Sequence, residues 1–156
     1  FDYKIYNEWL DENIATIGFY ASSTTSLASK SVKLSERLHV PGSKLRGFQV
    51  GKIGPKDGLD YIGGNYLAVI NASTTLPQIL PNLQNTDFSI FFDAANIWGT
   101  DYDSSIAQDN RVRSSIGLAV DIFTPIGPLN FSLTEVISKD CKDTTESFRF
   151  NLGTTF

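Results

Sequence analysis

The chain has 156 residues, enough for one domain, and carries 13 Lys and Arg against 17 Asp and Glu, for a formal net charge of −4. This balance argues against a nucleic-acid partner, because neutralising phosphates requires clustered positive charge. Apolar residues make up 41%, which is too many for a disordered chain and too few for a bundle of membrane helices. The chain starts at Phe1 and contains no Met, so we expect a piece of a longer protein.

Apolar and polar residues alternate along most of the chain, which is typical of half-buried strands. The last segment is the clearest, since Phe148, Phe150 and Leu152 alternate with polar neighbours. The segment after residue 65 is the least regular. In chain order, the expected strands cover residues 1–5, 15–21, 66–71, 87–94, 113–122, 129–134 and 147–156.

The predicted connections alternate between short turns and long polar loops. Short turns are expected at residues 11–13, 77–85 and 124–128, and long loops at about 24–63, 99–111 and 137–146. Such alternation is typical of an up-and-down outer-membrane β-barrel, whose periplasmic turns are short and whose outer loops are long. A soluble β-sandwich or barrel is the alternative, but a sandwich gives no reason for loop length to alternate.

A seven-stranded membrane sheet cannot be complete. Every backbone donor and acceptor in lipid must be paired, so a spanning sheet must close on itself, and single-chain bacterial barrels have an even number of strands, starting at eight. Because Phe1 already lies within an expected strand, we place the missing strands before it.

Several short motifs are specific enough to compare with a known family. They lie in the long loop, in two later strands and at the C-terminus. The motifs are PGSKLRGF at residues 41–48, GKIGP at 51–55, IGGN at 62–65, FFDAANIW at 91–98, PIGPLNFS at 125–132 and ESFRFNLGTTF at 146–156.

These motifs resemble those of the BamA family of outer-membrane protein assembly factors, in the bacterial surface antigen superfamily. The family has (V/L/I)RG(F/Y) and a following IGP in its sixth outer loop, and GGN opens the next strand. It has FFDxGNVW in another strand and SPxGPLxFS in a later turn and strand. Ala95 replaces the usual Gly of the FFDxGNVW motif, and Thr154 departs from a strictly apolar C-terminal β-signal. The motifs occur in the family order along nearly the whole chain.

The resemblance implies an all-β fold in which residues 1–156 form the C-terminal seven strands of a sixteen-stranded, antiparallel, up-and-down transmembrane β-barrel. The first nine strands and the periplasmic POTRA repeats would be missing. Residues 24–63 would form a loop that folds back into the barrel lumen. The location would be the cell outer membrane, with the C-terminus on the periplasmic side.

The resemblance also assigns roles to residues of the loop. The arginine of the loop motif, Arg46, would pair with Asp93 on the barrel wall. A second family acid is replaced by Ser73. The lumen-loop residues taken from the match are Leu45, Arg46, Gly47, Phe48, Ile53, Gly54 and Pro55.

The last strand would be one half of a lateral gate, the seam at which it meets the first strand. Gly153 matches the family glycine at which this strand kinks, and the strand ends in the aromatic β-signal. The gate and signal residues carried over from the family are Phe148, Phe150, Leu152, Gly153 and Phe156.

The implied function is the folding and insertion of β-barrel proteins into the outer membrane, without enzymatic chemistry and without a cofactor or metal. The implied partners are unfolded outer-membrane proteins, outer-membrane lipids and accessory assembly lipoproteins. The alternatives within the superfamily are a TamA-like or two-partner-secretion translocation pore and a barrel fused to a phospholipase. A passive barrel is a further alternative.

Other candidate sites are weak. Residues 51–58 lack the GK[ST] ending of a phosphate-binding loop, and His39 has no ligand partners at metal spacing. Asp101, Asp103 and Asp109 in the 99–111 loop are of a type that could hold a calcium ion, but we expect them to be solvated instead. Trp9 and Trp98 lie near expected strand ends, as membrane-interface residues do.

Overall fold

The structure is a computed structural model that describes residues 1–10, 13–27, 31–76, 85–101, 110–125 and 127–153. Trp9 and Leu10 are described by their backbone alone. The elements of these residues are β1 (Asp2–Leu10), β2 (Asn13–Ser23), the 3₁₀ turn η1 (Leu34–Glu36), β3 (Lys56–Asp57), β4 (Asp60–Tyr61), β5 (Tyr66–Thr75), β6 (Thr86–Trp98), β7 (Arg113–Thr124), β8 (Gly127–Ser138) and β9 (Phe148–Leu152).

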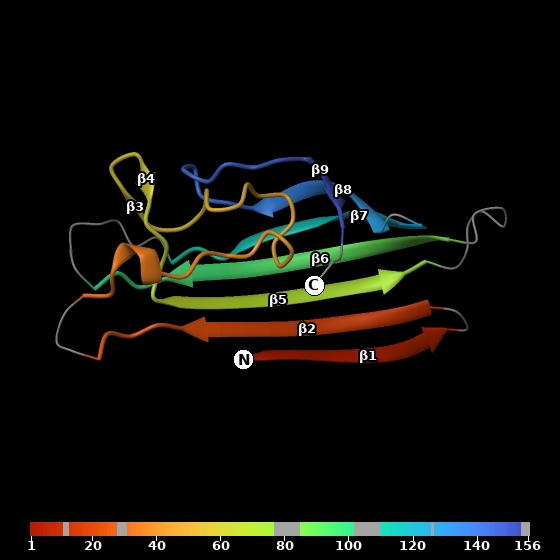
Figure 1. The fold of residues 1–156 in the computed structure, drawn as a ribbon, viewed down its shortest axis with the longest axis horizontal. Helices are drawn as coiled ribbons and strands as arrows, with labels where there is room; N and C mark the ends of the chain where they lie inside the picture. The colour runs from red at the N-terminus through yellow and green to blue at the C-terminus, as the bar shows by residue number, and fades with distance from the viewer. Residues whose placement is uncertain (11–12, 28–30, 77–84, 102–109, 126, 154–156) are drawn as a thin grey trace.

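The principal structure is an antiparallel sheet in which each strand pairs with its neighbour in the chain. The order is β1-β2-β5-β6-β7-β8-β9, and the short hairpin β3-β4 belongs to the long loop between β2 and β5 (Figure 1). This confirms the all-β, antiparallel, up-and-down arrangement. Among the described residues, no helix has the length and apolar character needed to cross a membrane.

One face of the sheet, here called the outer face, exposes apolar side chains. They meet across strands in register, as Ile70 does with Ala94 and Leu118 with Leu133. An apolar surface of this extent marks contact with another apolar phase or partner. Its large exposed members include Ile5, Ile17, Phe19, Ile70, Ile90, Phe92, Ile116, Leu118, Leu133, Phe148 and Phe150.

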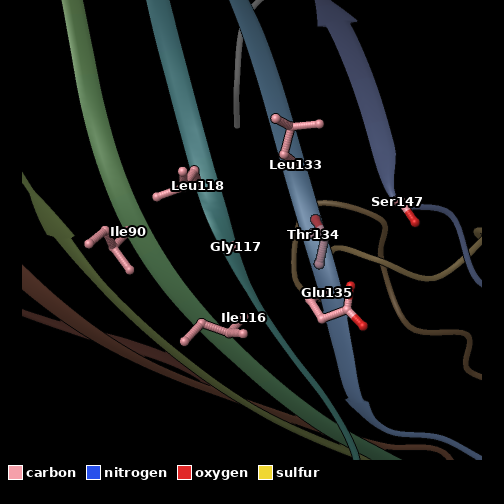
Figure 2. A pocket seen from close by; sticks show the side chains of 8 residues that line it. All are labelled: Ile90, Ile116, Gly117, Leu118, Leu133, Thr134, Glu135 and Ser147. Atoms are coloured by element: carbon pink, nitrogen blue, oxygen red, sulfur yellow. The ribbon is translucent and has the colours of Figure 1, made fainter.

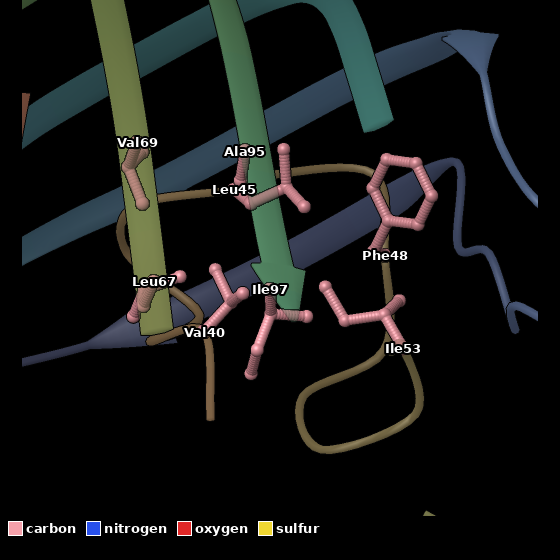
Figure 3. Close-up of a cluster of buried hydrophobic side chains, with 8 residues drawn as sticks. All are labelled: Val40, Leu45, Phe48, Ile53, Leu67, Val69, Ala95 and Ile97. Atoms are coloured by element: carbon pink, nitrogen blue, oxygen red, sulfur yellow. The ribbon is translucent and has the colours of Figure 1, made fainter. Parts of the chain in front are cut away.

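The opposite, inner face is covered by the loop that joins β2 to β5, drawn orange to yellow in Figure 1. Apolar side chains of β5 and β6 point inward where the loop lies on them, which explains why alternation is least regular after residue 65. The buried cluster, shown in Figure 3, consists of Val40, Leu45, Phe48, Ile53, Leu67, Val69, Ala95 and Ile97.

The strands are longer than the alternation predicted, except at the C-terminus. β6 continues to Trp98 and β8 to Ser138. Alternation did not predict these ends, because inward-facing Ala95, Ile97 and Val136 are apolar like the residues of the outer face. The described part of β9 is shorter than expected and covers Phe148–Leu152. Residues 154–156, including Phe156, lie outside the described residues, as do the centres of the expected turns at 11–13, 77–85 and 124–128.

Candidate functional site

The centre of the candidate site is an ion pair between the loop and β6. The Arg46 guanidinium donates through Nε to Asp93 Oδ2 at 2.7 Å and through Nη2 to Oδ1 at 2.8 Å. This two-point geometry matches the planar fork of arginine to the two oxygens of a carboxylate. The structure therefore brings together the loop arginine and the wall acid that the sequence motifs single out.

The carboxylate of Asp93 is fully buried and fully hydrogen-bonded. Besides the guanidinium, it accepts from the Arg46 amide at 3.1 Å and from Asn71 Nδ2 at 2.8 Å, and its side chain is 0% exposed. A carboxylate offers about four acceptor positions, so Asp93 is satisfied without water. Removing its cation would leave an uncompensated buried charge, which typically costs about 3–5 kcal/mol.

Asn71 on β5 also contributes to this centre, although the sequence pattern did not indicate that role. Asn71 pairs with Asp93 in the β5–β6 register, and its amide also donates to the Lys44 carbonyl at 2.7 Å. Ser73, where the resemblance implied a second acid, lines a cavity of about 170 Å³ with Lys4, Lys44 and other polar residues. The neutral amide of Asn71, rather than a side chain at position 73, therefore assists Asp93.

The Arg46 guanidinium also stacks on an aromatic ring. Its Cζ lies 3.4 Å from the centroid of Phe91, which is 1% exposed. Phe91 faces Gly117 across the β6–β7 ladder, and a Cβ at Gly117 would come within 2.6 Å of the Phe91 ring. Gly117 thus leaves the space that the Phe91 ring occupies beside the Arg46 guanidinium.

Gly47 is required by both backbone and space. Its φ is +87°, in the region where L side chains are strained, and a Cβ there would lie 2.6 Å from Thr134 Cγ2. On the same stretch, Ser115 Oγ donates to the Arg46 carbonyl at 2.6 Å. The loop backbone is therefore pressed against β7 and β8 as well as paired with β6.

The remaining loop residues of the predicted motif anchor the loop by burial. Leu45, Phe48 and Ile53 are 2%, 1% and 3% exposed within the buried cluster. Gly54 has φ of +100°, and a Cβ there would lie 2.7 Å from Ile97. Pro55 is buried, and its carbonyl accepts from the Ile62 amide at 3.0 Å. Each of the predicted loop residues thus contacts the inner face or closes the loop.

Two further arginines on the inner face bind connecting segments of the chain. Arg113 on β7 forms a fully buried two-point pair with Asp143, at 2.9 and 3.2 Å. Arg149 on β9 pairs with Glu146 and donates to the carbonyls of Gly42 and Phe48 in the loop. Both arginines lie on strands, but their carboxylate partners Asp143 and Glu146 lie between β8 and β9, where periodicity gives no signal.

The predicted gate residues that the structure describes lie at the edge of the sheet. Phe148, Phe150 and Leu152 are exposed on the outer face, and the Phe150 ring packs 5.0 Å from that of Phe131. Gly153 has φ of +120°, so the backbone leaves the extended conformation there. Its amide donates to the Pro128 carbonyl at 3.1 Å.

A shallow pocket of about 430 Å³ lies on the sheet near the start of β9 (Figure 2). Ile90, Ile116 and Leu118 supply apolar walls, and Glu135 places an exposed carboxylate beside them. The remaining lining residues are Gly117, Leu133, Thr134 and Ser147.

The acidic residues of the loop after β6 were expected to be solvated, and Asp101 is exposed, although its carboxylate also holds two partners of the chain. Asp101 accepts from the Val32 amide at 2.8 Å and from Arg37 at 2.8 Å. The Val32 amide, and to a lesser extent the Arg37 charge, hold the pKa of the Asp101 carboxyl below its ordinary value. Asp103 and Asp109 lie outside the described residues. Within the described part of the chain, no cluster of His, Cys, Asp and Glu is arranged to hold a metal.

The described end of β6 also carries an aromatic pair. Trp98 stacks on Tyr66 of β5 with centroids 5.9 Å apart, which is the position and residue type of an interfacial aromatic. The side chain of Trp9 is outside the description.

An open antiparallel sheet with an apolar outer face and a long loop docked by an arginine on its inner face defines one wall of a membrane-barrel type of protein. The Omp85 superfamily domain matches residues 1–156, and the chain belongs to this superfamily.

Two sequence relatives and one solved structure narrow the comparison to one kind of member. The outer membrane protein assembly factor BamA of Neisseria meningitidis serogroup B is 31% identical over 82% of this chain and 20% of its own length. BamA of Neorickettsia risticii is 25% identical over 73% of this chain and 16% of its own length. The crystal structure of BamA from Haemophilus ducreyi lacking POTRA domains 1–3 superposes with a TM-score of 0.84 at 28% identity, over 96% of this chain and 33% of that one. The chain thus spans about a fifth of the length of the Neisseria relative.

Proposed function

We propose that this chain is the C-terminal part of the β-barrel of an outer-membrane protein assembly factor, which folds and inserts other β-barrel proteins into the outer membrane. The observation that carries the proposal is the loop docked through Arg46 on Asp93, in a chain whose relatives are named as such factors. In the intact protein, further strands would pair with the exposed edge of β1 and close the barrel, because a sheet in lipid cannot keep an open edge.

The proposed mechanism makes and breaks no covalent bonds. The last strand would meet the first strand of the barrel at a seam, and opening of this seam would expose strand edges. An incoming client strand would pair with such an edge by β-augmentation, in which main-chain hydrogen bonds supply the affinity. Gly153, with its non-extended backbone, would weaken the pairing at the end of the last strand.

The proposed orientation follows from the connections. The turns between β1 and β2, β5 and β6, and β7 and β8 would face the periplasm together with the C-terminus, and the long loops would face outward. The apolar outer face would contact outer-membrane lipid. Unfolded barrel proteins would be the clients, and accessory lipoproteins would complete the assembly machinery.

Reconstitution tests this function. The intact protein, in vesicles of phosphatidylethanolamine and phosphatidylglycerol, should accelerate the folding of an added urea-unfolded barrel protein, scored as heat-modifiable migration on gels. A disulfide between a cysteine at Gly153 and the first strand should abolish the acceleration, and reduction should restore it. Cys141 is exposed and is replaced by Ser in all variants. Folding no faster than in empty vesicles would refute the function, and full activity in the cross-linked form would refute the gate.

A further inference from the structure

The segment that leads into the last strand is bonded to the loop. The Gln49 amide donates to the Thr144 carbonyl at 2.9 Å, and the Thr144 amide donates to the Lys52 carbonyl at 3.1 Å. The Glu146 amide donates to the Gly47 carbonyl at 3.0 Å. Phe48 and Thr145 consequently form an isolated antiparallel bridge. Residues 144–146 are thus attached to the loop directly before β9 begins.

This attachment coincides with the end of the pairing between β8 and β9. In the described residues the register joins 129–133 to 148–152, whereas β8 continues to Ser138. The last bond in this direction runs from the Thr134 amide to the Ser147 carbonyl, at 2.8 Å. Beyond it, the chain leaves β8 and turns onto the loop. The start of β9 is therefore held by β8 on one side and by the loop on the other.

A side chain of β9 reinforces the same attachment. The Arg149 guanidinium donates to the Gly42 carbonyl and, at 2.6 Å, to the Phe48 carbonyl, while Glu146 accepts from its Nε. The two loop carbonyls lie on either side of Arg46 in the sequence. The Arg149 side chain is 13% exposed, so water competes little for these bonds. Gly42 makes room for them, since a Cβ there would lie 3.1 Å from Arg149 Nη1.

We propose that Arg149 is a positioning residue that couples the loop to the last strand, so that release of the loop from Asp93 loosens the start of β9. Arg46 fixes the loop to β6, and Arg149 fixes the same loop to β9, with the stretch from Gly42 to Phe48 as the shared element. Displacement of that stretch breaks the Arg149 bonds and the backbone bonds to residues 144–146 together. This inference rests on the proposed function, for which it supplies a link between the loop and the seam.

Hydrogen–deuterium exchange of the intact protein in vesicles tests the coupling without any client. In Arg149→Gln, the amides of Gln49, Thr144 and Glu146 should exchange about tenfold faster as one group, because residues that open together share an exchange rate. Arg149→Lys, which offers a charge but no fork, should give a smaller increase. The matched control is Arg111→Gln, which removes an exposed bond to the Lys139 carbonyl and should leave these amides unchanged.

The decisive measurement is reciprocal. Asp93→Asn alters β6 and touches neither β9 nor Arg149, yet it should accelerate exchange in residues 144–150 while the β6–β7 ladder stays protected. Arg46→Lys is the second variant should Asp93→Asn not fold. Faster exchange of residues 44–52 with unchanged exchange of 144–150 would overturn the coupling. Client folding is scored separately, so coupled exchange in a protein that folds no client would refute the proposed function alone.

Discussion

Gly117 and Phe91 face each other across the β6–β7 ladder, and the Phe91 ring fills the space that a side chain on Gly117 would occupy. A Cβ on Gly117 would lie 2.6 Å from the Phe91 ring, and the same ring supports the Arg46 guanidinium at 3.4 Å. Aromatic rings that cover a strand glycine are a known means of fixing strand register. Here the ring connects a glycine of the wall to the arginine of the loop.

The first prediction concerns this glycine. Gly117→Ala should destabilise the intact protein by about 1–3 kcal/mol, the usual cost of overpacking, because it displaces Phe91 and presses on the Leu133 carbonyl. The measurement is the temperature at which heat-modifiable migration is lost. Gly18→Ala is the control, since the nearest atom to its new Cβ would be Lys4 Cγ at 3.6 Å. Equal effects of the two changes would contradict the packing argument.

The second prediction concerns the ion pair. Arg46→Ala should lower stability by about 3–5 kcal/mol, because it leaves the Asp93 carboxylate buried without its cation. Asp93→Asn should have the same direction of effect and impair client folding as well. The control is Asp87→Asn on the same strand, whose side chain is exposed and which should behave as wild type. Normal migration and normal client insertion in both Arg46→Ala and Asp93→Asn would exclude a role for the pair.

The third prediction separates strain from collision at Gly47. Gly47→Ala should cost about 1–2 kcal/mol for the left-handed backbone and more for the contact with Thr134 Cγ2. Gly51→Ala has a comparable φ of +70° with no atom within 4 Å of a new Cβ, so it measures the strain alone. Adding Thr134→Ser to Gly47→Ala should recover part of the difference. Thermal unfolding of the variants gives these values, and no recovery in the double variant would assign the whole effect to the backbone.

The fourth prediction concerns pH. Because the pKa of Asp101 is lowered on folding from its ordinary 3.8, its contribution to stability is complete above that value and is lost as pH falls through the lower, folded value. A spin label at Lys33→Cys, in a Cys141→Ser background, should therefore stay immobile between about pH 7 and pH 5 and become mobile only in stronger acid. Asp101→Asn should be mobile already at neutral pH. Mobilisation of the wild-type label above pH 5 would show that another group controls the segment.

The strands could be predicted from the local alternation of the sequence, whereas the central ion pair was implied by the resemblance of short motifs to a known family. Alternation marks the strands wherever one face is apolar and the other polar, and the RGF and FFD motifs mark Arg46 and Asp93. Where the loop covers β5 and β6, inward residues such as Leu67 and Ile97 are apolar too. Apolar and polar residues then no longer alternate, so the pattern does not mark the strand there.

The partners of the ion pairs are less accessible to sequence reasoning. The partners Asp143 and Glu146 lie in a loop whose path has no periodic signal, so the Arg113 and Arg149 contacts could not be anticipated. The position of the Phe91 ring under Arg46 depends on the space above Gly117, which the sequence pattern does not reveal. Asn71 was placed in an irregular strand and gave no indication of its bond to Asp93.

Ser73 stands where the family resemblance implied a second wall acid, and this has a consequence for how firmly the loop is held. Among the described residues, Asp93 is the one carboxylate that the Arg46 guanidinium contacts, and Asn71 supports it without adding charge. The attachment therefore has no electrostatic redundancy, and neutralising a single oxygen pair removes all of its ionic character. Removal of the Asp93 charge alone should therefore weaken the loop attachment as much as removal of both acids would in a protein that has two wall acids.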